Sequence, residues 1–447
     1  MIISILSSVV GRVAPILLIL SGIYFSARLN IVKLVAGALG KKNRSRRSGK
    51  VSPFAAVMMA LAGTLGVGNI VGVAGAISAG GYGAIFWMWA SSLCAMALKY
   101  AETVLAVSHR RSDGRGGFFG GAVYYIRDIF ASIGHDRAGS VTALVFSLLF
   151  LFDGFTTGCA VQVNAAAKAA ESIVGIPAIA VGVTAAVIAF IPAARGTENV
   201  AGLTTFLVPL LSGIYVILSA AVLIMRADRI PFAFSAIFSG AFSPESAAGG
   251  ILGFLTSRAL RFGTIRGLLS NEAGCGSSPT AHAAADTDDP VRQGFLGIFE
   301  VFADTIVLCT LTALVMIVNS DVPEVTGASG IMLAVKSYSV SLGGWSEYLL
   351  GASVAVFGLA TVICRAHYGC ECIRYFCRGN EKSPFRFIFL AAFSAVTVIG
   401  SVLSGEAVLD AADLSIGSMT ILNLAVLFLG RREVFALTKG YFDKEKS

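Results

Sequence analysis

Two glycine-rich segments interrupt long hydrophobic stretches of this sequence. They are residues 62–69, Ala-Gly-Thr-Leu-Gly-Val-Gly-Asn, and residues 270–279, Ser-Asn-Glu-Ala-Gly-Cys-Gly-Ser-Ser-Pro. Each glycine weakens a helix by roughly 1 kcal/mol relative to alanine, and backbone groups freed at membrane depth need protein, water or a ligand as partners. Turned N–H groups can hold an anion, and turned carbonyls a cation. The two breaks therefore predict one binding site built from both halves of the chain.

Polar side chains inside the hydrophobic stretches are costly and usually face a bundle interior. In the first break they are Thr64 and Asn69, and in the second break Glu272. A carboxylate at Glu272 can bind a cation directly or accept hydrogen bonds from the unwound backbone, and we favour the second role. The glycines from Gly72 onward fit close helix packing instead.

Other polar residues lie on the intervening spans. Gln162 and Asn164 are two residues apart, so at most one of them faces a central site. Asp153 pairs with a basic group or belongs to a cytoplasmic vestibule. Arg365 lies in the middle of a long hydrophobic stretch and is not a surface residue.

The sequence contains few patterns that indicate an enzyme. The eight cysteines lie in or beside hydrophobic stretches and lack paired Cys-x-x-Cys spacing, which favours small buried side chains over a metal site. The acidic run 286–289 lacks the facing acidic cluster that a magnesium-diphosphate site needs. It fits a turn whose aspartate caps the helix after Pro290. We expect no enzyme, with an intramembrane enzyme as a remote alternative.

The composition predicts an all-α integral membrane protein. Hydrophobic residues make up 56% and charged residues 13%, against roughly 25% charged residues in soluble domains. About 11 transmembrane helices are expected from stretches of about 17–25 apolar residues. These stretches are 12–31, 52–79, 82–108, 141–169, 173–193, 201–225, 247–285 with a break, 293–318, 346–378, 385–404 and 413–430.

The basic residues predict the topology of these spans. The segment 40–50 carries six basic residues and no acid, which places it in the cytoplasm by the positive-inside rule. The N-terminus is then outside and the C-terminus cytoplasmic. The basic segment 109–140 also falls inside, whereas Arg226 and Arg229 are exceptions in an outer segment. The net charge of +8 therefore reflects basic residues in the loops on the cytoplasmic side, and nucleic acid is not an expected partner.

Span order predicts an inverted repeat. When the first helix is set aside, ten spans remain, and five spans that begin inside must end outside. The next five are then inverted, as in many secondary transporters, and the two broken spans come first in each half. The expected divisions are an N-terminal helix and basic loop at 1–50, a first five-helix repeat at 51–226, a second inverted five-helix repeat at 247–430, and a cytoplasmic tail at 431–447.

Several motifs resemble those of the alanine or glycine:cation symporter family, and they occur in the same order along the chain. They are Ala-Gly-Thr-Leu-Gly-Val-Gly-Asn-Ile-Val-Gly-Val-Ala at 62–74, Lys-Tyr-Ala-Glu at 99–102, Gly-Gly-Ala-Val-Tyr-Tyr-Ile at 120–126, Arg-Gly-Leu-Leu-Ser-Asn-Glu-Ala-Gly-Cys-Gly-Ser-Ser-Pro-Thr-Ala-His-Ala-Ala-Ala at 266–285, and Pro-Val-Arg-Gln-Gly at 290–294. The resemblance implies sodium-coupled import of small neutral amino acids such as alanine or glycine into the cell, by alternating access. It also implies the five-plus-five inverted repeat of the amino acid–polyamine–organocation superfamily with an extra N-terminal helix.

The resemblance also implies site residues. The substrate-binding residues it implies are Thr64, Gly66, Gly68, Asn69, Gln162, Asn271, Gly274, Cys275, Gly276 and Arg365. The cation-binding residues it implies are Leu65, Gly68 and Thr361, while Glu272 supports the break. No cofactor is expected besides sodium as the coupling ion. The expected partners are a small amino acid, sodium and the lipid of the plasma membrane, and the expected state is a monomer.

This chain departs from the family pattern beside the site. Arg365 and Cys370 stand where the family has a tryptophan and a glutamate, and Cys275 stands where it often has methionine. An arginine in the pocket would attract a second carboxylate. The alternatives are therefore a carrier for anionic or larger amino acids, or a proton-coupled carrier.

Overall fold

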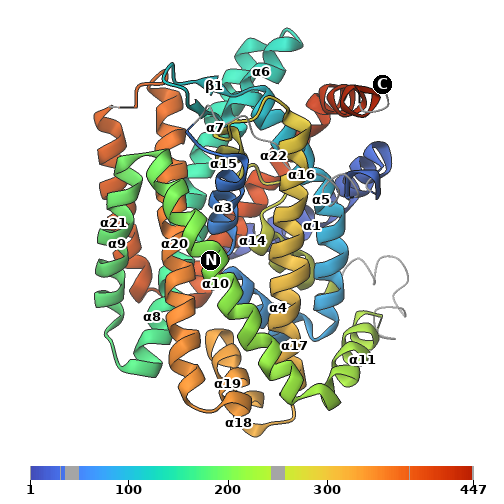
Figure 1. The fold of residues 1–447 in the computed structure, drawn as a ribbon, viewed down its shortest axis with the longest axis vertical. Helices are drawn as coiled ribbons and strands as arrows, with labels where there is room; N and C mark the ends of the chain where they lie inside the picture. Colours follow the sequence, from blue (N-terminus) through green and yellow to red (C-terminus); the bar gives the residue numbers. More distant parts are fainter. Residues whose placement is uncertain (1, 31, 36–49, 243–256, 382, 445–447) are drawn as a thin grey trace.

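The fold was examined in a computed structural model, which describes all residues except 1, 31, 36–49, 243–256, 382 and 445–447. The described chain is a bundle of long helices with one two-stranded hairpin at one end (Figure 1). The predicted basic loop at 40–50 falls almost wholly outside the described residues, as does the start of the predicted span 247–285.

An N-terminal helix and five spans precede residue 226. Their elements are α1 (Ile2–Leu29), α3 (Pro53–Thr64), η1 (Gly68–Gly72), α4 (Val73–Gly80), α5 (Gly83–Ser108), β1 (Arg111–Ser112), β2 (Phe118–Phe119), α6 (Ala122–Ser132), α7 (Asp136–Phe155), η2 (Thr156–Ala160), α8 (Val161–Val174), α9 (Ala178–Arg195) and α10 (Thr197–Met225). The short helices η3 (Ala227–Arg229) and α11 (Ile230–Ala241) follow.

The second half repeats this plan. Its elements are α14 (Arg258–Asn271), α15 (Pro279–Ala283), α16 (Pro290–Val301), η4 (Phe302–Cys309), α17 (Thr310–Val318), α18 (Pro323–Thr326), α19 (Gly330–Leu342), α20 (Trp345–Phe376), α21 (Pro384–Val402) and α22 (Gly405–Lys444). The segments η1, η2 and η4 are π-helical turns, a feature often found at functional sites.

The two halves are arranged as an inverted repeat. Equivalent spans pack against each other: α5 against α16, α8 against α20, and α9 against α21. A short helix precedes the third span in each half, namely α6 and α19. These two helices lie at opposite ends of the bundle (Figure 1), as inversion of one half requires.

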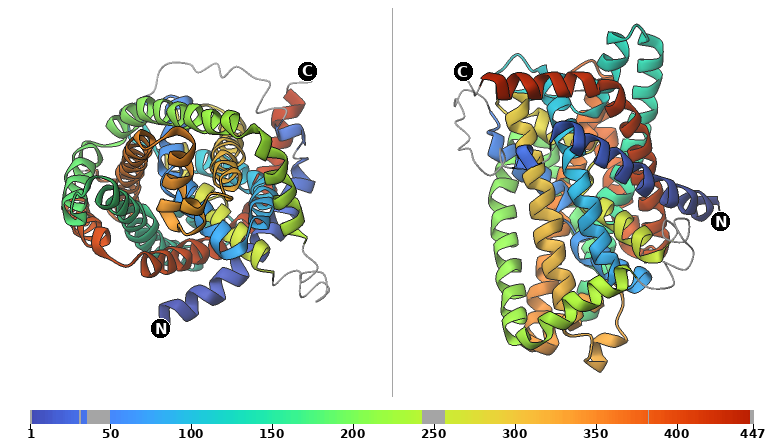
Figure 2. Two further views of the ribbon diagram at one scale, coloured as in Figure 1. Left: turned by 90° about the horizontal axis from the view of Figure 1, so that it is seen from below. Right: turned by 90° about the vertical axis from the view of Figure 1, so that its right-hand side faces the viewer.

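The predicted spans are found in the structure with shifted bounds. In the described part of the chain, nine helices are long and apolar enough to cross a membrane, and the bent pair of Pro53–Thr64 and Gly68–Gly80 makes ten. The remaining predicted span contains α14 and α15, which are separated by the second break. The helix α22 continues to Lys444 and lies across the end of the bundle in its last part (Figure 2).

The extra helix α1 lies outside the inverted pairs. It packs against α5 and α22 (Figure 2), and a side chain at Gly22 would come within 2.6 Å of Cys94 Cβ. The aromatic rings of Tyr24 and Phe25 contact Phe428 on α22. Close backbone approach and aromatic packing therefore fix α1 on the surface of the ten-span core.

The two breaks are marked by changes in the backbone direction and conformation. The helix α3 begins at Pro53 with Ser52 as its cap, since the Ser52 hydroxyl accepts a hydrogen bond from the Ala55 N–H at 3.1 Å. It ends at Thr64, and the chain turns by 51° before it resumes at Gly68. The second break begins at Glu272, which adopts a left-handed conformation with φ of 50°, and continues through Gly274 and Gly276 with φ of 84° and 85°.

The acidic run 286–289 has the predicted capping role. The Asp289 carboxylate accepts a hydrogen bond from the Val291 N–H at 2.9 Å, and Pro290 begins α16. The Arg110 guanidinium donates to the carbonyls of Ala285 and Thr287. This run is therefore part of a structured turn.

Candidate functional site

The first break is held open by a side chain from α8. The Val67 N–H donates a hydrogen bond to Gln162 Oε1 at 2.9 Å. A Cβ at Gly66 would lie 2.3 Å from Gln162 Oε1 and 2.7 Å from Thr361 Oγ1. Glycine leaves room here for both side chains, and Gln162 is the one of the two predicted alternatives on α8 that faces the break. Asn164 instead donates to the carbonyls of Gly400 and Leu403.

Thr361 connects α20 to the same break. Its hydroxyl donates to the Ala62 carbonyl at 2.8 Å and lies 3.2 Å from the carbonyl of Phe357 on its own helix. Ala62 was not among the predicted cation ligands, although it is the carbonyl that Thr361 reaches. The oxygen atoms of Thr361 and of the α3 terminus are thus in contact across the site.

Arg365, one turn after Thr361, is enclosed by acceptors from three elements. Its Nη1 lies 3.0 Å from Asp153 Oδ2, its Nη2 forms an ion pair with Glu272, and its Nε donates to a carbonyl of the first break, that of Gly63, at 3.3 Å. All three charged side chains are at most 2% exposed. Asp153 therefore pairs with a basic group, which was one of its two predicted roles.

A glycine on η2 makes room for this arginine. A Cβ at Gly158 would lie 2.8 Å from Arg365 Cβ. The π-helical turn at 156–160 thus lies between Asp153 and Gln162, the two side chains of this span that reach the site. No single motif predicted this arrangement, because it depends on the register of two helices far apart in the sequence.

Glu272 does not support the second break in the way we expected. Its carboxylate accepts from Ser277 Oγ at 2.5 Å and pairs with Arg365. The backbone of this break is instead bound by Glu102 on α5, which accepts from the Gly274 N–H at 3.1 Å. Our favoured role for Glu272 therefore belongs to Glu102, whose position in an apolar helix was the available signal.

Asn423 on α22 completes the contacts of Glu102. Its amide donates to Glu102 Oε1 at 2.6 Å and to the Gly274 carbonyl at 3.0 Å, and Tyr125 donates to its Oδ1 at 2.6 Å. A Cβ at Gly276 would lie 2.8 Å from Phe146. The segment 274–276 is thus turned towards α5, α7 and α22.

A further buried carboxylate, that of Asp304 on η4, lies between the two breaks. It accepts hydrogen bonds from Asn69 Nδ2 at 2.8 Å, Ser270 Oγ at 2.5 Å and Thr305 Oγ1 at 2.8 Å. Asp304 is fully buried, and within the described residues these hydrogen-bond partners are all neutral. The Asn271 amide donates to Thr305 Oγ1 and Ser92 Oγ, both at 3.0 Å. Asn69 and Asn271 therefore belong to the surroundings of Asp304 and not to those of Arg365.

A buried charged network holds the chain after the second break. Lys99 Nζ lies 3.1 Å from Glu300 Oε1 and 2.7 Å from Ser278 Oγ. His282 Nε2 lies 2.9 Å from the other oxygen of Glu300, and Gln293 contacts its Nδ1 at 2.9 Å. This network joins α5, α15 and α16 and fixes the position of α15.

The other predicted residues have local roles. The Thr64 hydroxyl donates to the carbonyls of Ala60 and Leu61 in its own helix. The Cys275 thiol donates to the Glu272 carbonyl at 3.0 Å. A Cβ at Gly68 would lie 3.4 Å from the Leu269 carbonyl oxygen, so the first break contacts α14 there through backbone.

A small cavity lies beside the first break. It measures about 10 Å³, and it is lined by Leu65, Gly66, Asn69, Ile70, Tyr215, Leu308 and Phe357. This space accommodates about one water molecule, so an amino acid enters only if the surrounding helices move. Among the residues with described positions, no three His, Cys, Asp or Glu side chains are grouped as metal ligands.

Comparison with known proteins places this geometry in a family. The model described as the sodium:alanine symporter family matches residues 1–447. The chain is 33% identical to the sodium/alanine symporter AgcS of Methanococcus maripaludis, over 99% of this chain and 96% of that protein. It is also 33% identical to the probable sodium/glutamine symporter GlnT of Bacillus subtilis, over 98% of this chain and 89% of that protein.

A solved structure shares the fold at low sequence identity. It is the substrate-bound outward-open state of a Na⁺-coupled sialic acid symporter, with a TM-score of 0.53 and 16% identity, covering 95% of this chain and 87% of that chain. The protein is an all-α, multi-pass membrane transporter with an inverted repeat, and it is not an enzyme. The chain belongs to the sodium:alanine symporter family.

Proposed function

We propose that this transporter imports small neutral amino acids, such as alanine or glycine, together with sodium. Family membership supports amino-acid symport, and the relatives compared above carry names for sodium-coupled alanine and glutamine transport. The substrate's carboxylate and ammonium groups are expected at the backbone of the two breaks, near Gly66 and Asn271.

The observation that carries sodium coupling is the environment of Asp304. A fully buried carboxylate is costly unless an opposite charge compensates it. Asp304 receives only neutral donors from Asn69, Ser270 and Thr305, and Asn69 Oδ1 is buried without a hydrogen-bond partner among the described residues. These oxygen atoms are the ligand type that hard cations prefer. Sodium between the two breaks would supply the missing charge.

A second position for sodium lies at the end of α3. It includes the Thr361 hydroxyl and the carbonyls of this region, with Ala62 added to the predicted Leu65 and Gly68. The contact of Thr361 with the Ala62 carbonyl at 2.8 Å supports Thr361 as the hydroxyl ligand. Sodium there would join α3 to α20.

The surroundings of Arg365 favour a neutral substrate over an anionic one. Arg365 faces two carboxylates, Asp153 and Glu272, so their formal charges already exceed its own. A further substrate carboxylate would be repelled by this cluster. Arg365 therefore serves as a connection between helices, and the reason for expecting an anionic substrate is weakened.

This connection also suggests how access alternates. Arg365 connects α20 to α7 and to both breaks. It follows Thr361 along α20, which runs towards the end of the bundle that carries the β1–β2 hairpin (Figure 1). Basic residues gather at this end, including Arg110, Arg111 and Arg378, and the positive-inside rule assigns it to the cytoplasm. The ion pairs would then close the inward path, and sodium and substrate would be released when these pairs separate.

Ligand screening tests the proposal. The unfolding midpoint of the purified full chain is measured with each of the twenty amino acids, with sodium or with potassium. We expect alanine, glycine or a similar small neutral amino acid to raise the midpoint in sodium only. Asp304→Asn is expected to abolish the sodium requirement or the stabilisation, whereas the exposed control Asp228→Asn leaves both unchanged.

Two outcomes would overturn parts of this proposal. If amino acids stabilise the protein equally in sodium and potassium, and the stabilisation depends on pH, the coupling ion at Asp304 would be a proton and not sodium. Stabilisation by glutamate or aspartate, but not by neutral amino acids, would replace the substrate class.

A further inference from the structure

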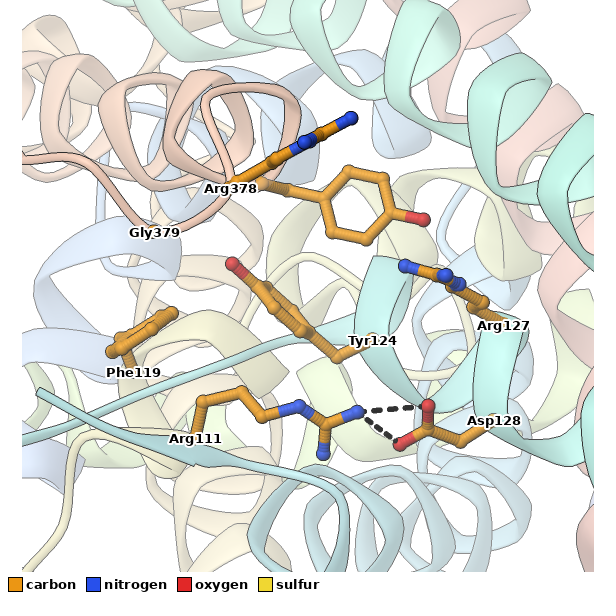
Figure 3. A pocket seen from close by; sticks show the side chains of 8 residues that line it. Arg111, Phe119, Tyr124, Arg127, Asp128, Arg378 and Gly379 are labelled. Atoms are coloured by element: carbon orange, nitrogen blue, oxygen red, sulfur yellow. Dashed lines mark hydrogen bonds and ion pairs between the residues drawn. The ribbon is translucent and has the colours of Figure 1, made fainter. Parts of the chain in front are cut away.

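A pocket far from the two breaks lies at the end of the bundle that carries the hairpin. Its volume is about 340 Å³, and it lies between the β1–β2 hairpin, α6 and the turn after α20 (Figure 3). The lining residues are Arg111, Phe119, Tyr124, Arg127, Asp128, Tyr375, Arg378 and Gly379. Neither the transport path nor the sodium positions described above includes any of them.

The charge of this pocket is unbalanced. Its lining has three arginines and one aspartate. Arg111 Nη2 donates to both oxygens of Asp128, at 2.8 and 2.7 Å, as the dashed lines in Figure 3 show. Asp128 also lies 3.1 Å from His109 Nδ1, so two cations already share it. The side chains of Arg127 and Arg378 form no hydrogen bond or ion pair with any residue whose position is described.

A buried hydroxyl adds an unused hydrogen-bonding group to the same pocket. Tyr124 is 8% exposed, and its hydroxyl has no partner among the described residues. Its ring is fixed by edge contacts with Tyr375 and Phe119, whose centroids are 5.1 and 5.8 Å away. Because an unpaired buried hydroxyl is unfavourable, this rigidly placed group is suited to a ligand that accepts a hydrogen bond.

The backbone of Arg378 is strained where it enters the pocket. Its φ is +52°, a left-handed conformation that is uncommon for a long side chain. Figure 3 shows Arg127 and Arg111 on two sides of the Tyr124 ring, and Arg378 on the far side of a further aromatic ring. Strain of this kind is often retained at binding sites.

We propose that this pocket binds the phosphate group of a phosphate ester. Arginine guanidinium groups match phosphate oxygens in geometry and charge, and the Tyr124 hydroxyl can donate one further hydrogen bond. The volume of about 340 Å³ exceeds that of a phosphate group alone and is within the range of small-molecule pockets. The organic group attached to the phosphate would lie against the rings of Phe119 and Tyr375. A phospholipid headgroup and soluble glycerol 3-phosphate both carry this chemistry.

The test measures unfolding midpoints of the full chain in detergent with two probes. One is glycerol 3-phosphate, titrated against sodium chloride of equal ionic strength. The other is phosphatidylglycerol in mixed micelles, titrated against phosphatidylcholine. We expect a saturable rise with at least one probe. A rise with glycerol 3-phosphate alone identifies a soluble ligand, and a rise with phosphatidylglycerol alone identifies a lipid.

Matched variants assign the effect to the pocket. Arg127→Gln combined with Arg378→Gln is expected to weaken the apparent Kd by about tenfold or more. The control combines Arg137→Gln with Arg292→Gln, which removes two exposed arginines outside the pocket, and is expected to keep the wild-type Kd. Tyr124→Phe should raise the ligand-free midpoint, because it removes an unpaired buried hydroxyl, and should reduce the shift that the probe causes.

Clear results would overturn the proposal. It is wrong if neither probe gives a saturable rise, or if the control variant weakens binding as much as the pocket variant. It is also wrong if Tyr124→Phe and the pocket variant both retain the full shift. Sodium-dependent stabilisation by amino acids is measured separately in each variant, so failure here is distinct from failure of the transport proposal.

Discussion

Arg365 on α20 and Asp153 on α7 form a buried ion pair, with Nη1 and Oδ2 3.0 Å apart across a sequence separation of 212 residues. Glu272 of the second break pairs with the same guanidinium. Three elements of the site therefore depend on one side chain. Arg365 is thus paired with carboxylates of the protein itself.

Replacement of this arginine is expected to destabilise the protein strongly. Arg365→Gln leaves Asp153 and Glu272 buried without a cation, and loss of one partner from a buried pair costs about 3–5 kcal/mol. We expect a lower free energy of unfolding and loss of transport. The measurement is chemical unfolding in detergent, together with uptake into proteoliposomes.

Lys336→Gln is the control for this replacement. Lys336 pairs with Glu347 at 2.9 Å, but its side chain is 36% exposed, so its loss should cost less than about 1 kcal/mol. Equal stability of Arg365→Gln and the wild type would show that the ion pairs do not hold the helices together.

Gly66→Ala is expected to abolish uptake. The new Cβ would lie 2.3 Å from Gln162 Oε1 and 2.7 Å from Thr361 Oγ1, so both side chains would have to give up their present contacts with the break. Gly202→Ala is the control, because open space surrounds that position on α10 and alanine favours a helix by roughly 1 kcal/mol. Wild-type uptake by Gly66→Ala would contradict the assigned close approach.

Thr361→Val is expected to weaken the dependence of transport on sodium, measured as the sodium concentration that gives half-maximal uptake. Valine keeps the shape but removes the hydroxyl that reaches the Ala62 carbonyl. We expect that concentration to rise about tenfold, because a loss of about 1.4 kcal/mol in the free energy of sodium binding corresponds to a tenfold weaker affinity. Thr361→Ser should restore the wild-type value.

Thr397→Val provides the matched control for Thr361. Thr397 is also buried, and its hydroxyl donates at 2.8 Å to the carbonyl of Phe393 in its own helix. If both valine variants change the sodium dependence equally, the effect does not depend on the contact with α3.

His109 is expected to stabilise the protein in a pH-dependent way. Burial disfavours its charge, but hydrogen bonds to Asp128 and Glu433 outweigh that effect and raise its pKa from 6.5 to about 9. A raised pKa in the folded state gives stabilisation that is complete below pH 6.5 and lost as the pH rises through about 9.

The comparison of wild type with His109→Gln isolates this effect. Their difference in free energy of unfolding should be largest at about pH 6 and should shrink steadily towards about pH 10. A difference that stays constant over this range would show that His109 is not charged in the folded protein.

The architecture was largely predictable from the sequence. Hydrophobic stretches determine where membrane helices form, and Gly66, Gly68, Gly274 and Gly276 mark where those helices break. Asp289 could be recognised as a cap because capping depends on neighbours in the sequence. The inverted order of spans then followed from the number of crossings between the two breaks.

The contacts within the site were less predictable. Glu102 accepts the backbone hydrogen bond of the second break, whereas Glu272 accepts from the Ser277 side chain. This division depends on how α5 faces Gly274. Similarly, Asn69 contacts Asp304 through the register of η1 against η4. A sequence motif identifies the polar residues of a span but not the direction in which each helix turns them.

Uptake of radiolabelled alanine into proteoliposomes that contain the purified full chain tests sodium-coupled import. An inward sodium gradient is imposed and compared with an equal potassium gradient. We expect alanine to accumulate transiently above its external concentration in sodium, and we expect this accumulation to disappear in potassium and in Asp304→Asn. Equal uptake in sodium and potassium would contradict sodium coupling.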